Sequence, residues 1–272
     1  MKLTFLGTGT SFGVPQIGCP CAVCHSTDPR DRRTRVGAIV ETDTGTRLLL
    51  DTPPELRLQL LAAGIDRVDA VLFTHDHADH IHGVDDIRAF TVRRDSPLPM
   101  YGLPETLDRL AQRFPYIFDE SVRPMPGTSK PEGKALPIRD GEAVTIGDAT
   151  VRAIALPHGN TTVLGFRIGP FAYVTDAKRV PEEAIALLRG ARVLVVNALF
   201  HKQHPTHLSI GEALAVSASV GAERTFLTHL THENFHADLR AKLPRGVSPA
   251  FDGLVVAVDG DSLADEVSEG DE

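Results

Sequence analysis

The feature that most constrains this chain is the heptapeptide THDHADH at residues 74–80, which directly follows the apolar run VDAVLF. Its seven positions hold three histidines and two aspartates. Imidazole and carboxylate groups are ligands for zinc, manganese and iron. An apolar strand that opens into such a cluster is typical of a rigid scaffold that presents a site at a strand end. The fold must therefore end a buried strand here and let these side chains converge.

Three further apolar segments end in a histidine or an aspartate, namely VRAIALPH at His158, FAYVTD at Asp176 and RTFLTH at His229. Strand ends of a layered α/β fold lie along a common edge, so these side chains can meet although they are far apart in sequence. The pattern predicts further strands at KLTFL, VGAIVET, RLLLDT, VLGFRI, VLVVNALF and LVVAVDG.

Helices are predicted in PELRLQLLAAG, which stops at a glycine, and in SIGEALAVSASVGAE, where Ser209 and Glu212 have the spacing of a capping box. Residues 114–141 are rich in proline and glycine and predict a long irregular excursion. Alternating strand and helix patterns of this kind indicate an α/β fold.

The length of 272 residues suits a single large domain, which we place at residues 1–260. Residues 261–272 are acidic and poor in apolar side chains, so we expect a disordered tail there. No apolar run reaches membrane length. The start MKLTFLGTGTSFG lacks the long apolar segment of a signal peptide. We therefore expect a cytoplasmic protein without a membrane partner.

The formal charge of −8 and the pI near 5.8 argue against an extended nucleic-acid surface, although a small anionic substrate remains compatible with them. One basic stretch stands out at RDRRTRV, with Arg30, Arg32, Arg33 and Arg35. Two interpretations stay open for it: a solvated loop whose arginines pair with nearby acids, or a phosphate-binding segment.

The motif HDHADH with downstream His158, Asp176 and His229 resembles the metallo-β-lactamase superfamily of hydrolases. The resemblance implies a four-layer αββα sandwich with a dinuclear metal site at one edge of two sheets. It also implies two divalent cofactors, zinc or manganese, which could generate a hydroxide nucleophile and bind an anionic substrate. The ligands it implies are His75, His77 and His158 for one metal, Asp79, His80 and His229 for the other, and Asp176 as the bridge.

A second cluster is the segment GCPCAVC, which holds all three cysteines of the chain, Cys19, Cys21 and Cys24. Three cysteines within six residues of a cytosolic protein favour a metal over disulfides. Zinc needs a fourth ligand, and His232 is a good candidate because THLTHE places it three residues after His229. A redox pair of Cys21 and Cys24 is the alternative, although no amphipathic helix of the thioredoxin type follows it.

This cysteine loop after LGTGTSFGVP, together with the T-H-x-x-H ending, resembles the PhnP-type cyclic phosphodiesterases of the carbon–phosphorus lyase pathway. In that group the cysteines and the second histidine hold a structural zinc. The group also carries a histidine before a helix that assists phosphoester cleavage. PTHLSIGEA supplies His207 at this place, and the resemblance makes His207, Asp176 and Asp79 the implied catalytic residues. His201 and His204 lie close by and are competing candidates.

Three smaller features need an interpretation. The glycines of LGTGTSFG miss the G-x-G-x-x-G spacing by one residue, so we exclude a nicotinamide cofactor. Asp51, which follows the strand RLLL, is either a turn residue or a hydrogen-bond acceptor for a ligand histidine. Asp85 and Asp86 are expected in the first turn of a helix or in contact with Arg88.

The function that these features favour is hydrolysis of a small, cyclic phosphodiester, such as a ribosyl cyclic phosphate or a cyclic nucleotide, by a metal-bridging hydroxide. An RNA-processing nuclease of the same fold is the alternative enzyme, and it would need a basic docking surface. A noncatalytic zinc-binding accessory protein is the third hypothesis. It would have degraded catalytic ligands, whereas all seven positions are intact here. A homodimer is compatible with the sequence.

Overall fold

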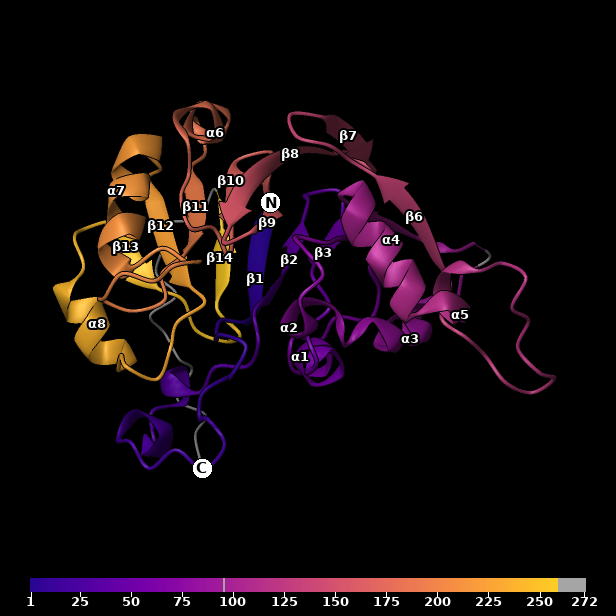
Figure 1. The fold of residues 1–272 in the computed structure, drawn as a ribbon, viewed down its shortest axis with the longest axis horizontal. Coiled ribbons are helices and arrows are strands. Elements are labelled where there is room, and N and C mark those ends of the chain that lie inside the picture. The colour runs from indigo at the N-terminus through magenta and orange to yellow at the C-terminus, as the bar shows by residue number, and fades with distance from the viewer. Residues whose placement is uncertain (95, 259–272) are drawn as a thin grey trace.

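Two seven-stranded sheets form the centre of the protein in the computed structural model, which describes residues 1–94 and 96–258 (Figure 1). The expected tail at 261–272 lies outside the described residues. In spatial order, the first sheet consists of β14 (Val255–Ala257), β1 (Lys2–Gly7), β2 (Gly37–Glu41), β3 (Arg47–Leu50), β4 (Ala70–Leu72), β5 (Leu98–Gly102) and β6 (Gly133–Pro137). The second consists of β13 (Val247–Pro249), β12 (Arg224–Thr228), β11 (Val193–Asn197), β10 (Phe171–Val174), β9 (Thr161–Ile168), β8 (Ala149–His158) and β7 (Ala143–Ile146).

Both sheets change from antiparallel to parallel pairing halfway across. In the first sheet, β14, β1, β2 and β3 pair antiparallel, whereas β3, β4, β5 and β6 pair parallel. In the second, β7 to β10 are antiparallel and β10 to β13 are parallel. Parallel strands end at the same sheet edge, so each parallel half can present several loops side by side.

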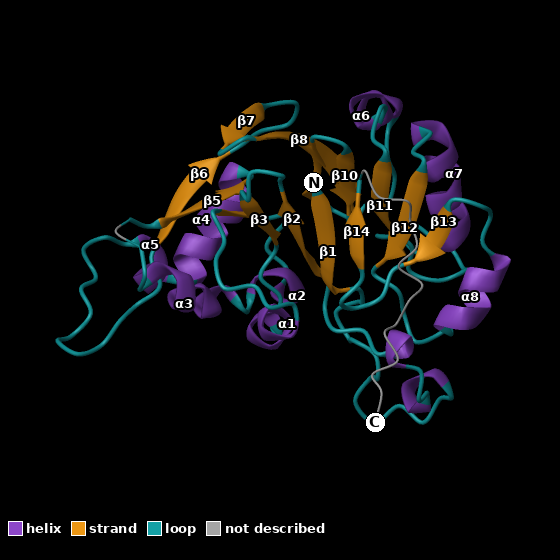
Figure 2. Cartoon of the chain, turned by 180° about the vertical axis from the view of Figure 1, so that it is seen from behind, coloured by secondary structure: helices purple, strands orange, loops and turns teal. Residues whose placement is uncertain are grey.

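Helices cover the outer face of each sheet, as Figures 1 and 2 show. The helices beside the first sheet are α1 (Leu56–Ala62), α2 (Ala78–Ile81), the 3₁₀ helix η3 (Val84–Ile87), α3 (Arg88–Thr91), α4 (Pro104–Arg113) and α5 (Pro115–Phe118). Those beside the second sheet are α6 (Glu182–Leu188), α7 (Ile210–Val220) and α8 (His236–Lys242). Two short 3₁₀ helices, η1 (Val23–His25) and η2 (Pro29–Asp31), lie in the loop after β1.

Burial on both faces explains why central strands such as β3 are apolar along most of their length. In β3, Leu48 and Leu50 point into the core between the two sheets, while Leu49 packs into the core under α1 and α4. Phe166 contributes to the inter-sheet core from the second sheet. A strand with helices on one side and a second sheet on the other has no solvated face, so it shows no polar alternation. The predicted αββα sandwich is confirmed.

The prediction of a long irregular excursion at residues 114–141 was only partly correct. It contains α5 and β6, and β6 extends the first sheet beside β5. The strands β5, β7 and β13 were also missed, because each is short or contains a proline that interrupts the strand pattern. No helix in the described part of the chain is long and apolar enough to span a membrane.

We predict that Leu50→Ala lowers the free energy of unfolding by about 2–5 kcal/mol, because it removes a fully buried side chain and leaves a cavity between the sheets. Leu61→Ala on α1 is the matched control. That side chain is 65% exposed, so the same substitution should change stability by less than about 0.5 kcal/mol. Urea denaturation of both variants measures the difference, and equal losses would contradict the layer assignment.

Candidate metal centre and active site

The predicted ligands lie at or beyond the carboxyl ends of four strands. His75 and His77 lie on the non-repetitive stretch after β4, and α2 begins one residue later and carries Asp79 and His80. The other three are the last residue of β8, His158, and two residues that follow β10 and β12, Asp176 and His229. Strand β4 is shorter than its apolar run, since Phe73 and Thr74 already belong to the loop.

The structure brings all seven side chains together. Ligand atoms lie within 4.8 Å of one another in the set His75, His77 and His158, and also in the set Asp79, His80 and His229. Asp176 lies close to both sets: its Oδ2 is 3.3 Å from His80 Nε2 and its Oδ1 is 3.1 Å from His229 Nε2. Its carboxylate also lies within 4.8 Å of ligand atoms of His75 and His158. The first two groups match the two ligand sets that the resemblance implies, and the bridging role of Asp176 stays a prediction.

Backbone strain is concentrated at this site. The non-glycine residues with positive φ in the described part of the chain are Asp51, Asp176 and His229, with φ of 61°, 58° and 57°. Each lies at or just beyond the end of a strand. This conformation costs of order 1–3 kcal/mol per residue and persists only where the surroundings enforce it. The sandwich therefore holds three polar residues of the site in orientations that relaxed strand ends would not adopt.

For three of the histidines, hydrogen bonds fix which nitrogen faces the centre. The His80 Nδ1–H donates to Asp51 Oδ2 at 2.8 Å, so the second interpretation of Asp51 is confirmed. The Thr74 hydroxyl also donates to Asp51, and it accepts from His75 Nδ1 at 3.0 Å. His158 Nδ1 donates to the Thr206 carbonyl at 2.9 Å. Each ring thus uses Nδ1 for support and directs Nε2 into the site, as metal-ligating histidines commonly do.

The chemistry of the site fits divalent cations. Among the described residues, the buried Nε2 atoms of His75, His80 and His229 have no hydrogen-bond partner, although such atoms are rarely left unsatisfied. Burial lowers the pKa of His75, His77 and His158, which keeps them neutral and able to bind a metal. Burial opposes ionisation of Asp176, but His229 and His80 still hold its pKa well below the ordinary value.

The raised pKa of His80 shows that the cluster favours a positive charge. Burial would lower its pKa, yet Asp176, Asp51 and Asp79 raise it well above the ordinary value. Three carboxylates around one imidazole thus force a proton onto it. A divalent cation between these groups would satisfy the same demand and leave His80 as a neutral ligand.

His207 lies at the rim of this cluster. Its Nε2 is 2.9 Å from Asp176 Oδ1 and its Nδ1 is 2.8 Å from the Thr206 hydroxyl. Ser209 begins α7 with the predicted capping box to Glu212, which fixes the loop that carries His207. His204 shares the Thr206 hydroxyl at 3.1 Å, whereas His201 is exposed to solvent. Of the three candidate histidines, His207 is the one in contact with a predicted metal ligand.

The cysteine cluster forms a second, separate site. The sulfurs of Cys19, Cys21 and Cys24 lie 3.2, 3.5 and 3.5 Å from His232 Nδ1. A tetrahedral zinc with ordinary bond lengths gives a sulfur–nitrogen separation of about 3.5 Å. All three sulfurs face the same imidazole nitrogen, an arrangement that a redox pair of Cys21 and Cys24 would not require. The geometry fits a Cys₃His zinc site, with His232 three residues beyond His229.

Three of the four arginines in the basic stretch are paired within the protein, whereas Arg32 is exposed. Arg30 pairs with Asp28, and Arg35 pairs with Glu55. Arg33 is fully buried, pairs with Asp31 at 3.4 Å and donates to the Asn234 carbonyl at 3.1 Å. The expected pairing with nearby acids is therefore observed, but the expectation of a solvated loop was wrong for Arg33. Asp85 pairs with Arg88 at 2.8 Å, as predicted.

The ion pairs of Asp76 are a part of the site that was not predicted from the sequence. Asp76, between His75 and His77, is buried and paired with Arg109 and Arg113 of α4. The two arginines have i, i+4 spacing, which indicates only that they share a helix face. Nothing in the sequence connects that face with the histidine motif.

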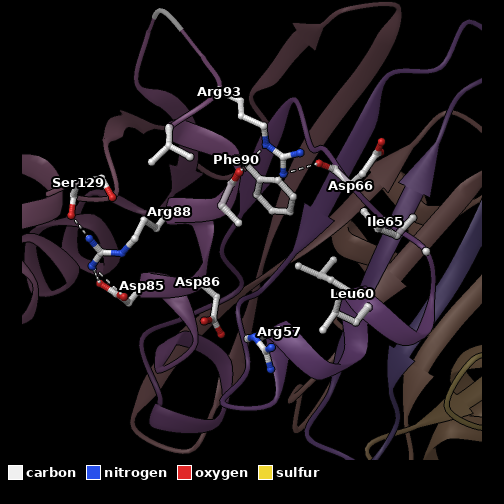
Figure 3. Close-up of a pocket in the computed structure, with 14 residues that line it drawn as sticks. Arg57, Leu60, Ile65, Asp66, Asp85, Asp86, Arg88, Phe90, Arg93 and Ser129 are labelled. Carbon is white, nitrogen blue, oxygen red and sulfur yellow. Dashed lines mark hydrogen bonds and ion pairs between the residues drawn. The ribbon is translucent and has the colours of Figure 1, made fainter. Parts of the chain in front are cut away.

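One sizeable pocket is not part of the metal centre. Figure 3 shows this pocket, of about 660 Å³, between α1 and the η3–α3 segment, with Leu60, Ile65 and Phe90 along its apolar wall. Its lining includes none of the predicted ligands. The reactive groups instead lie at the sheet edge.

This fold and this convergence of histidine and aspartate residues define a metal-dependent hydrolase. Residues 46–230 match the Beta-lactamase superfamily domain family, so the chain belongs to the metallo-β-lactamase superfamily. Both resemblances noted from the sequence, to the superfamily and to the PhnP group, are confirmed.

The chain is similar to several known proteins. A structure described as a new diphosphatase from the PhnP family superposes with a TM-score of 0.86 at 38% identity, covering 94% of this chain and 96% of that one. The chain is also 38% identical to a Porphyromonas gingivalis protein named Octanoyltransferase, over 95% of this chain but 52% of that relative, so it spans about half of that relative's length. Ribonuclease Z of a Bradyrhizobium strain is 28% identical, over 94% and 99% of the two chains.

We predict that Asp176→Ala lowers catalytic metal content severely while the cysteine-bound zinc stays, because the two sites use separate ligands. Elemental analysis of the purified variant measures both. An equal loss of all metal would contradict the division of ligands.

Cys21→Ser is predicted to act on stability. A structural zinc contributes directly to folding and loses affinity when a thiolate is replaced. We expect a lower Tm and the loss of close to one zinc per chain. An unchanged Tm together with an unchanged zinc content would exclude the structural site.

Proposed function

We propose that this chain hydrolyses a small phosphodiester, with a cyclic ribose phosphate or cyclic nucleotide as the preferred type. The observation that carries the proposal is His207, whose Nε2 lies 2.9 Å from Asp176 Oδ1 at the edge of the ligand cluster. Hydrolysis of a phosphodiester must stabilise negative charge at phosphorus and protonate an alkoxide leaving group. An imidazole beside a binding site for cations suits the second requirement.

The ligand set would hold two divalent metals, zinc or manganese, with Asp176 as the bridge. Such a pair would polarise the phosphoryl oxygens and lower the pKa of a bound water. The chain's own residues orient the ligand histidines and supply the proton for the leaving group. Asp51 and Thr74 orient His80 and His75. The Thr206 hydroxyl orients His207, which would donate its proton to the departing oxygen.

An RNA-processing activity is less well supported. The similarity to ribonuclease Z favours it. However, three of the four arginines in the dense basic stretch, Arg30, Arg33 and Arg35, pair with Asp28, Asp31 and Glu55. Only Arg32 of this stretch is left exposed. A noncatalytic accessory role is disfavoured by the complete ligand set. Metal analysis separates an enzyme of this fold from a noncatalytic accessory protein, since we expect three metals per chain for the enzyme and one for the accessory protein.

The experiment that tests the proposal is a substrate panel assayed with manganese and with zinc. It contains a ribosyl cyclic phosphate, 2′,3′-cyclic nucleotides, linear diesters, a diphosphate diester, a short RNA, a thioester and a lactone. The diphosphate diester is included because the similar PhnP-family structure is described as a diphosphatase. Greatest turnover on the thioester or lactone would overturn the proposal. Preference for the diphosphate or the RNA would redirect it to that substrate.

We predict that His207→Ala lowers turnover of a cyclic ribose phosphate by about a hundredfold or more with metal content unchanged, the usual scale for general acid catalysis. A nitrophenyl phosphodiester has a leaving group that needs little protonation, so its turnover should fall much less. His201→Ala, at an exposed position nearby, is the matched control.

Three outcomes would change this assignment. Equal losses on both substrates would make His207 a stabiliser of the phosphoryl oxygens. Loss of metal would make it a ligand, which its grouping with His158 and Asp176 allows. Sensitivity of His204→Ala instead would show that the neighbouring histidine is the acid.

A further inference from the structure

The backbone that carries His75 and His77 has no regular secondary structure. Residues 73–77 lie between β4 and α2. Two histidines of one predicted metal site therefore depend on bonds from other elements for their position. Phe73 N–H donates to the Tyr101 carbonyl at 2.7 Å, and Thr74 N–H donates to Asp51 Oδ1 at 2.8 Å. These bonds fix the start of the stretch.

Two arginines of α4 hold the middle of the stretch through Asp76. Arg109 donates to Asp76 Oδ1 at 2.9 Å, and Arg113 lies 2.9 Å from Oδ2. Arg113 also donates to the Asp76 main-chain carbonyl. The contacts therefore fix both the side chain and the backbone of the residue between the two histidines. We call Arg109, Arg113 and Asp76 the arginine clamp.

The exposure of its side chains indicates that the clamp positions the loop more than it stabilises the fold. The Asp76 side chain is 9% exposed, whereas those of Arg109 and Arg113 are 51% and 44% exposed. Ion pairs with such solvated partners contribute little to folding. Their geometry still restricts the loop, because each guanidinium binds a different oxygen.

We propose that Arg109 and Arg113 are positioning residues that hold His75 and His77 in ligand geometry through Asp76. The proposal rests on the metal centre and not on the identity of the substrate. Electrostatics alone predicts the opposite effect, because removing a cation near a site for divalent cations should strengthen metal binding. The sign of the change in metal affinity therefore decides between a positioning role of the arginines and a purely electrostatic effect.

The test is a manganese titration of protein stripped of catalytic metal, with free Mn²⁺ followed by electron paramagnetic resonance. Arg109→Gln and Arg113→Gln should each weaken manganese binding about tenfold, the lower end of what support residues of metal ligands contribute. Arg57→Gln, an exposed arginine of α1, makes the same charge change elsewhere and should have no such effect. Zinc at the cysteine cluster and the Tm serve as checks on folding.

A double-mutant cycle tests the route through Asp76. In an Asp76→Asn background, Arg109→Gln should have little further effect. Arg113→Gln should retain part of its effect, because it also binds the backbone carbonyl. Arg113→Lys keeps the charge and should restore binding only partly. Unchanged or tighter manganese binding in both glutamine variants would overturn the proposal, whether or not a phosphodiester is the substrate.

Discussion

Buried negative charge at one sheet edge is the constraint on which the rest of the site depends. Asp51 and Asp176 are almost fully buried, and Asp79 lies beside them. An uncompensated carboxylate costs several kcal/mol in such surroundings. The protein gathers imidazoles around these groups, and the high pKa of His80 is the direct consequence. Divalent cations bound here would supply the compensating charge, so the arrangement fits a metal site.

The sandwich makes this concentration of charge possible. Two sheets packed face to face and covered by helices form a rigid body whose strand ends cannot relax independently. The positive φ angles of Asp51, Asp176 and His229 lie at three of these ends. Their cost is offset by the buried strands β3, β10 and β12 that precede them. Strain, charge and unsatisfied nitrogens thus coincide at the edge where the predicted ligands of both sheets meet.

The sequence predicted this site well because its ligands follow apolar strands directly. THDHADH after VDAVLF, and the endings at His158, Asp176 and His229, mark strand ends without knowledge of the fold. The capping box at Ser209 likewise depends on local spacing. By contrast, β6 was missed because the proline- and glycine-rich stretch before it hides a strand that forms only by pairing with β5. Asp76 and α4 were not connected because their contact spans 33 and 37 residues. A contact of that kind is set by packing, and local pattern carries no signal of it.

The two predicted metal sites are separate in their ligands but share one turn. His229 belongs to the catalytic set and His232 to the cysteine cluster, with three residues from one to the other. Leu230 N–H donates to the Thr8 carbonyl at 2.9 Å, and the buried Arg33 reaches the carbonyls of Thr231 and Asn234. Main-chain bonds between Arg33 and Val14 also tie this arginine to the start of the cysteine loop. The predicted zinc site therefore lies at one end of a turn whose other end carries a predicted catalytic ligand, His229, in a strained conformation. This explains why a buried arginine occupies this position, since an apolar side chain could fill the space but could not bind the carbonyls on both sides of His232.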